Sequence, residues 1–124
     1  MSLVARQLEE AGIPTVVIGA GRDIVEHCGV PRFLFTDFPL GNPVGRPGDA
    51  AMQKQCVGMA LDMLEHSFAP RTTVQTPFVW SADHTWRDQY MRLDESNRAE
   101  LARLGEERRQ DQMAAKSDGR ARSL

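Results

Sequence analysis

The chain has 124 residues, of which 41% are hydrophobic and 26% charged, a composition typical of one globular domain and not of a disordered chain. Its formal net charge is −2, so the overall charge gives no reason to expect binding to nucleic acid or to an acidic membrane surface. No apolar run approaches the roughly 20 residues of a membrane-spanning helix, and the N-terminus lacks the pattern of a signal peptide. We therefore expect a cytoplasmic protein that binds neither nucleic acid nor membranes.

The N-terminal third alternates between helix and strand signals. Residues 2–11 carry apolar side chains at helical spacing, and Gly12 is a typical helix-ending residue. Residues 15–18 are all β-branched, which predicts a strand covered on both faces. A short helix over residues 23–28 and a second strand over residues 33–36 follow. This order predicts an α/β fold, a small parallel sheet with flanking helices.

An irregular loop follows the second predicted strand. Residues 37–48 contain three prolines and three glycines, which excludes regular structure. Open α/β sheets bind ligands beyond the carboxyl ends of their strands, and this loop begins at such an end. It is therefore a candidate substrate-binding loop, with a rigid connector as the equally open alternative. The residues that it offers are Asp37, Pro39, Gly41, Asn42 and Arg46.

A largely buried helix is predicted over residues 49–68. Asp49 can cap it, and methionines and other apolar residues form one broad stripe along it. Cys56 lies within this stripe, which predicts a packed core thiol and not a reactive one. Because Cys56 and Cys28 lie in different predicted helices without CxxC spacing, the sequence indicates neither a disulfide framework nor a zinc site.

The C-terminal part is more polar. Residues 71–80 look extended, but their alternation is too weak to predict a strand. Residues 93–115 favour a charged helix with few apolar positions, which suits either a solvated appendage or an arm lying across another chain. Residues 117–124 are expected to be disordered. We thus expect an α/β domain over residues 1–80 and a charged helical extension with a disordered tail over residues 81–124.

Three segments in order carry a family likeness: residues 4–16 (VARQLEEAGIPTV), residues 29–32 (GVPR) and residues 38–43 (FPLGNP). Over residues 3–80 the chain resembles the C-terminal portion of selenoprotein B of the glycine, sarcosine and betaine reductases and its cysteine-containing relatives. The resemblance implies a redox family in which a selenocysteine or cysteine reacts from a strand-to-helix turn. That turn would precede the helix over residues 2–11, where this sequence has no counterpart, so no catalytic residue is carried over.

The resemblance leads to an expected function. We expect a small subunit of a heteromeric redox or C–N/C–S bond-cleaving enzyme, an oxidoreductase-like complex that acts on a small molecule. A larger subunit would supply the missing strand and the nucleophilic turn, and a homo-oligomer is the alternative. Two other functions stay open: a non-catalytic binding or assembly protein that retains the fold, and a metal-dependent enzyme that uses Asp23, His27 and Cys28. The sequence indicates no particular cofactor.

The chain's own candidate catalytic residues are Cys28, His27 and Asp37. A neighbouring histidine can activate a thiol, but adjacent residues in a helix do not face each other, and a helix C-terminus raises a thiol pKa. Asp23 and His27 are four residues apart and could bind a metal with Asp37 or His84. A capping interaction or surface ion pair is the alternative reading of the same spacing. The glycines at positions 19 and 21 lack the third glycine of a dinucleotide-binding turn.

Overall fold

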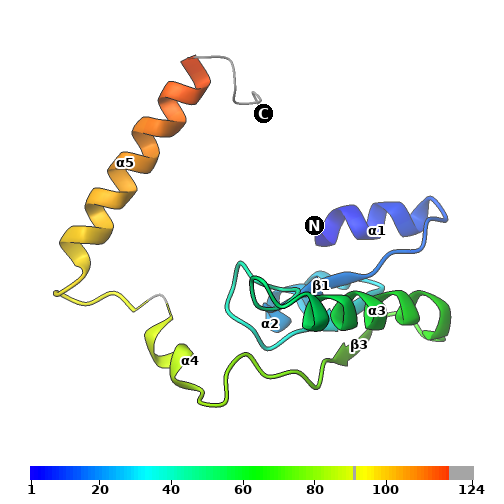
Figure 1. Ribbon diagram of the computed structural model, residues 1–124. Coiled ribbons are helices and arrows are strands. Elements are labelled where there is room, and N and C mark those ends of the chain that lie inside the picture. The colour runs from blue at the N-terminus through cyan, green and yellow to red at the C-terminus, as the bar shows by residue number, and fades with distance from the viewer. Residues whose placement is uncertain (91, 118–124) are drawn as a thin grey trace. The chain divides into compact units, whose positions relative to one another are not determined.

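The computed structural model describes residues 1–90 and 92–117, which belong to two compact units, one ending at Tyr90 and one following it. Each unit is described by itself. Figure 1 shows the elements, which in chain order are α1 (Ser2–Glu10), β1 (Val17–Gly19), α2 (Arg22–Cys28), β2 (Arg32–Phe35), α3 (Ala50–His66), β3 (Thr72–Gln75), α4 (Thr85–Gln89) and α5 (Arg98–Ser117).

The three strands form one parallel sheet in the order β1-β2-β3. Ile18, Leu34 and Val74 lie side by side across it. This arrangement confirms the predicted α/β class with a small parallel sheet and flanking helices. Residues 71–80, for which the sequence did not predict a strand, contain β3 at residues 72–75. Their sequence, Thr-Thr-Val-Gln, has little periodicity of its own, and pairing with β2 decides their conformation.

The first strand is shorter and starts later than predicted. Its three residues begin at Val17 because Thr15 takes part in other contacts. The Thr15 N–H donates to Glu9 Oε1 at 2.5 Å, and its hydroxyl lies 3.3 Å from the Ala5 carbonyl oxygen. Thr15 therefore connects the sheet to α1 instead of extending the ladder.

The faces of the sheet are covered by different helices. On one face, Ala60 and Met63 of α3 pack on Leu34, with Ile18 and Val74 beside it. On the other face, Val25 of α2 approaches Gly19, and the rings of Phe33 and Phe35 lie together. The sheet is thus sandwiched between α3 and α2, and Leu34 is fully buried at its centre.

Helix α3 begins where the sequence predicts. The Asp49 side chain caps it by accepting a 3.0 Å hydrogen bond from the Met52 N–H. Its N-terminal half also carries a second apolar cluster, in which Phe38 from the loop packs against Met52 and Cys56. Other residues that pack on this cluster are Val44, Phe78 and Trp80. The loop over residues 37–48 is therefore folded onto α3.

The unit after Tyr90 contains α5, a charged helix without a buried residue. Before it, Asp94 Oδ1 accepts hydrogen bonds from the Ser96 and Asn97 N–H groups at 3.0 and 3.2 Å, so the helix starts at Arg98 and not near Leu93. Of the expected disordered tail over residues 117–124, Ser117 is the last residue of α5, so the prediction was wrong there, and residues 118–124 lie outside the described residues. None of the described helices is both long and apolar enough to cross a membrane.

Candidate functional site

Two threonines mark the edge of the sheet where the strands end. Thr36 follows β2 and Thr76 follows β3, and the two residues are 0% and 4% exposed. The Thr36 hydroxyl donates to the Pro43 carbonyl oxygen at 2.7 Å, and its N–H donates to the Gly19 carbonyl oxygen at 2.9 Å. Thr36 thus fixes the base of the loop over residues 37–48 to the carboxyl end of the sheet.

A pocket of about 220 Å³ lies beyond the ends of β2 and β3. This is the edge at which open α/β sheets commonly bind ligands. Its walls come from the end of β2, from the chain that follows β3 and from α4. The lining residues are Asp37, Gln75, Thr76, Pro77, Phe78, Val79, Trp80, His84, Trp86 and Arg87.

The segment that carries α4 is tied to the loop by polar contacts. The Arg87 guanidinium forms an ion pair with Asp37. The Tyr90 hydroxyl donates to the Leu40 carbonyl oxygen at 2.8 Å. The Arg87 guanidinium also lies 5.1 Å from the centre of the Trp86 ring. The contacts of Arg87 with Asp37 and of Tyr90 with Leu40 join the segment of α4 to the loop over residues 37–48.

Of the five predicted loop residues, Asp37 lines this pocket and the other four do not. Pro39 and Asn42 close a turn, in which the Asn42 N–H donates to the Pro39 carbonyl oxygen at 3.1 Å. Gly41 lies in this turn with φ +97°, a value that favours glycine. Arg46 pairs with Asp49, the cap of α3, at 3.1 Å. Of the predicted loop residues, the structure thus places Asp37 at the pocket, while Asn42 and Arg46 make contacts within the chain.

The predicted metal-binding residues separate into two places. His84 lies in the pocket with Asp37, whereas Asp23 and His27 are exposed on α2. Within the described ranges, no three side chains of the types His, Cys, Asp and Glu gather closely enough to hold a metal ion. The pocket therefore offers hydrogen bonds, one ion pair and aromatic walls.

Neither thiol lies in this pocket. Cys28 is the last residue of α2, and its carbonyl oxygen accepts a 3.3 Å hydrogen bond from the Arg6 guanidinium. Cys56 is fully buried, and burial raises the pKa of its thiol, so it stays protonated at neutral pH. The described residues thus contain no thiol at a helix N-terminus, the position that most readily generates a thiolate.

Sequence reasoning missed Thr76, Trp86 and Arg87. These residues reach the pocket only because β3 ends beside β2, which brings the chain after it to the same edge as Asp37. A strand prediction for residues 71–75 would have revealed Thr76, since carboxyl ends of parallel strands meet at one edge. Trp86 and Arg87 lie on α4, which no pattern in the sequence predicted.

A second feature is an apolar groove of about 540 Å³ between α1 and the free edge of β1. Its lining residues are mostly hydrophobic, and Ser2 and Thr15 are the two with polar side chains. The lining residues are Met1, Ser2, Val4, Ala5, Leu8, Thr15, Val16, Val17, Ile18, Gly19, Val25, Pro43 and Val44. Val17, Ile18 and Gly19, the three residues of β1, are among them, so the groove lies along this strand.

Glu9, near the C-terminal end of α1, links this helix to Thr15 and Arg32. Its carboxylate accepts hydrogen bonds from Thr15 Oγ1 at 3.1 Å and from Arg32 Nη1 at 2.6 Å, besides the Thr15 N–H. Burial alone raises the pKa of Glu9, but the hydrogen bonds from Thr15 and the positive charge of Arg32 together lower it. Glu9 is therefore ionised at neutral pH and fixes α1 to the sheet.

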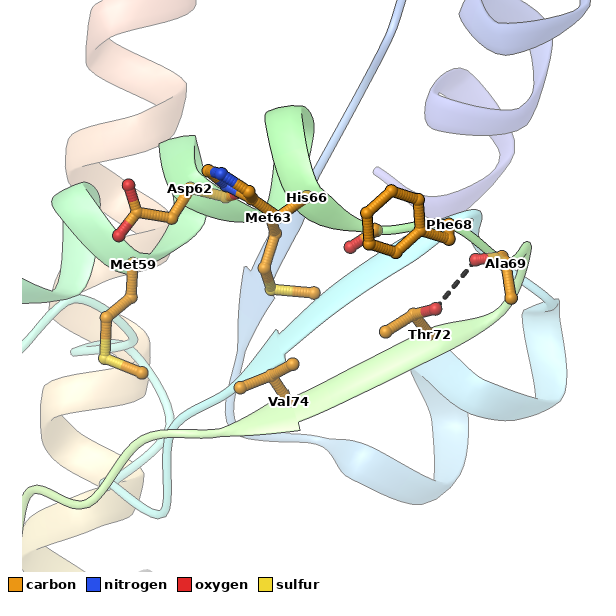
Figure 2. Close-up of a pocket in the computed structure, with 9 residues that line it drawn as sticks. Met59, Asp62, Met63, His66, Phe68, Ala69, Thr72 and Val74 are labelled. Atoms are coloured by element: carbon orange, nitrogen blue, oxygen red, sulfur yellow. Dashed lines mark hydrogen bonds between the residues drawn. The ribbon is translucent and has the colours of Figure 1, made fainter.

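A third hollow, of about 510 Å³, lies between α3 and β3 (Figure 2). Met63 and Val74 point into the space between helix and strand, and Phe68 is 97% exposed just beyond the end of α3. His66 Nδ1 contacts the Asp62 carbonyl oxygen at 3.0 Å, so this histidine makes its polar contact within α3. The hollow is an apolar surface without converging polar groups.

Comparison with known proteins gives one informative relative. The chain is similar to D-proline reductase subunit gamma of Acetoanaerobium sticklandii, with 32% identity over 80 residues that cover 64% of this chain and 33% of that subunit. The chain thus spans about a third of the length of the curated relative that it matches. No family model matches the sequence, and no solved structure matches it. The chain is therefore a distant relative of a reductase subunit, which agrees with the reductase relationship that the sequence predicted.

Proposed function

We propose that the chain is a small subunit of a heteromeric reductase that cleaves a C–N or C–S bond in a small molecule, and that the reacting thiol or selenol comes from another chain. The observation that carries the proposal is the similarity to a D-proline reductase subunit. The positions of the two cysteines support it, because Cys56 is buried and Cys28 ends a helix. The chain's contribution is then structural support and binding.

The groove beside β1 is the proposed contact with the larger subunit. Within the described residues, β1 pairs only with β2, so one edge of the strand has free backbone groups. The Gly19 carbonyl oxygen accepts from the Thr36 N–H, which places Gly19 on the paired edge. Because backbone groups alternate along a strand, the N–H and C=O groups of Ile18 face the free edge.

An added strand fits both properties of this groove. Its main chain would satisfy the free groups of β1, and its apolar side chains would fill the space beneath Val4 and Leu8 of α1. Such an occupant is an extended, apolar segment of the larger subunit. The contacts of Glu9 with Thr15 and Arg32 hold α1 to the sheet. This mode of binding explains why an apolar groove nevertheless remains between α1 and the sheet.

The test is to tag the chain in its native host, purify the complex and measure dithiol-dependent consumption of D-proline and related amino acids. We expect a larger subunit to co-purify with this activity. Val4→Glu places a charge in the groove and should abolish both co-purification and activity. Leu3→Glu is the matched control, because Leu3 is 72% exposed and does not line the groove.

Two results would contradict the proposal. One is a monomeric, well-folded chain from which no partner can be recovered. The other is a complex that forms but shows no dithiol-dependent reduction of any such substrate, which would favour an assembly protein.

A further inference from the structure

Two residues that line the pocket at the carboxyl ends of β2 and β3 have hydrogen-bond donors that the protein itself does not satisfy. Among the described residues, Thr76 Oγ1 and Trp86 Nε1 are buried and have no hydrogen-bond partner. Both residues line this pocket. A buried polar group without a partner is uncommon in folded proteins, and leaving it so costs free energy.

The contrast with Thr36 strengthens this observation. Thr36 and Thr76 occupy equivalent places after neighbouring strands, since Phe35 pairs with Gln75. The Thr36 hydroxyl donates to the Pro43 carbonyl oxygen, whereas the Thr76 hydroxyl has no partner although its residue is 4% exposed. A purely structural threonine at position 76 would gain nothing over valine, which has the same shape.

The chemistry of the lining selects the ligand. An indole N–H only donates hydrogen bonds, and a threonine hydroxyl can donate. Arg87 adds further donors, while its ion pair with Asp37 cancels the negative charge of that carboxylate. A group with several acceptor lone pairs, such as an oxyanion, satisfies these donors together. Phe78, Trp80 and the Trp86 ring form apolar walls for the rest of the ligand.

The volume limits the ligand to a small molecule. At about 220 Å³, the pocket lies below the roughly 300 to 1,000 Å³ that is typical of ligand pockets. We propose that this pocket binds a small molecule through an oxyanion, a carboxylate or a phosphate, which accepts hydrogen bonds from Thr76 and Trp86. The inference deepens the proposed function and rests on it only for the ligand's role in a reaction.

The test uses the full chain and the indole N–H signals of its two tryptophans in two-dimensional NMR. Acetate, benzoate and inorganic phosphate are titrated at constant pH and ionic strength, with acetamide and benzamide as uncharged controls. We expect a saturable shift of the Trp86 signal, which Trp86→Phe assigns, with an anion and not with the amides. Saturation by carboxylates alone or by phosphate alone identifies the kind of oxyanion.

Matched variants test the donors. Thr76→Val should weaken anion binding at least about tenfold, the loss expected for a hydrogen bond to a charged group. Thr85→Ala should leave it unchanged, because Thr85 is exposed on α4 and contacts Asp83, not the pocket. Thermal unfolding is an independent measurement. Thr36→Val should lower the midpoint by about 4 to 8 °C, because it removes the hydrogen bond to Pro43. Thr76→Val should not lower the midpoint, because the Thr76 hydroxyl has no partner to lose.

The inference is overturned if none of the three anions shifts the Trp86 signal saturably, if the amides bind as well as the anions, or if Thr76→Val binds as tightly as the wild type. Binding can succeed in the isolated chain even when no reductase partner exists. The failure of this site and the failure of the proposed function are therefore distinguishable.

Discussion

At the scale of single residues, Glu9 is the clearest case of a charged side chain with a structural task. It is the acceptor for the Thr15 N–H, the Thr15 hydroxyl and the Arg32 guanidinium, and these contacts join α1 to the sheet. Glu9→Gln should lower the free energy of unfolding at pH 7 by about 1 to 2 kcal/mol, because hydrogen bonds to a charged acceptor weaken. Urea unfolding measures this loss.

The contribution of Glu9 to the free energy of unfolding should be smaller at low pH than at neutral pH. Its pKa in the folded protein is lower than the ordinary value of 4.5, so its ionisation stabilises the fold at neutral pH. This contribution is lost as the pH falls from about 4.5 through the folded-state pKa. The difference between wild type and Glu9→Gln should therefore shrink at pH 3. Glu10→Gln, at an exposed position, should show neither effect.

Substitution of Cys28 tests the proposal that the reacting thiol belongs to another chain. It is partly buried at the end of α2, outside the pocket at the strand ends. Cys28→Ser should leave most of the activity of the purified complex intact. A complete loss of turnover, with folding and assembly unchanged, would instead make Cys28 the nucleophile.

At the scale of elements, α3 anchors the fold through only part of its apolar stripe. Met63 is 6% exposed and packs on Leu34, whereas Leu61 is 56% exposed. Met63→Asp should unfold the domain, because burying an unpartnered carboxylate costs several kcal/mol. Met59 is partly buried at the hollow of Figure 2, so Met59→Asp should destabilise less.

Thermal unfolding followed by circular dichroism gives the order of these variants. Leu61→Asp is the control on the same helix and should stay close to the wild type. An equal midpoint for Met63→Asp and Leu61→Asp would show that α3 does not pack on the sheet through Met63.

At the scale of the whole molecule, the two compact units should differ in what they contribute. Helix α5 has no buried residue, and its larger apolar side chains are exposed. Deletion of residues 91–124 should therefore leave the thermal midpoint of the rest within a few degrees of the full chain. If α5 is an arm that lies across a partner, the same deletion should weaken co-purification of the larger subunit markedly. A deletion that unfolds residues 1–90 would contradict this division.

The sequence alone determined the elements whose signals are local. Helix α1, the Asp49 cap and the stripe of α3 follow from spacing and capping chemistry, and β2 follows from a run of apolar residues. The alternation of these elements was enough to predict the α/β class and the parallel sheet. The position of Asp37 beyond the end of β2, where it lines the pocket, also followed from this topology.

Tertiary structure alone decided the third strand and the pocket. Residues 72–75 become a strand because β2 offers a free edge, and their own pattern gives almost no signal. That pairing brings Thr76 beside Thr36 and carries Trp86 and Arg87 to Asp37. Contacts between residues 50 positions apart, such as Arg87 with Asp37, leave no periodic trace in a sequence, so only the folded chain reveals them.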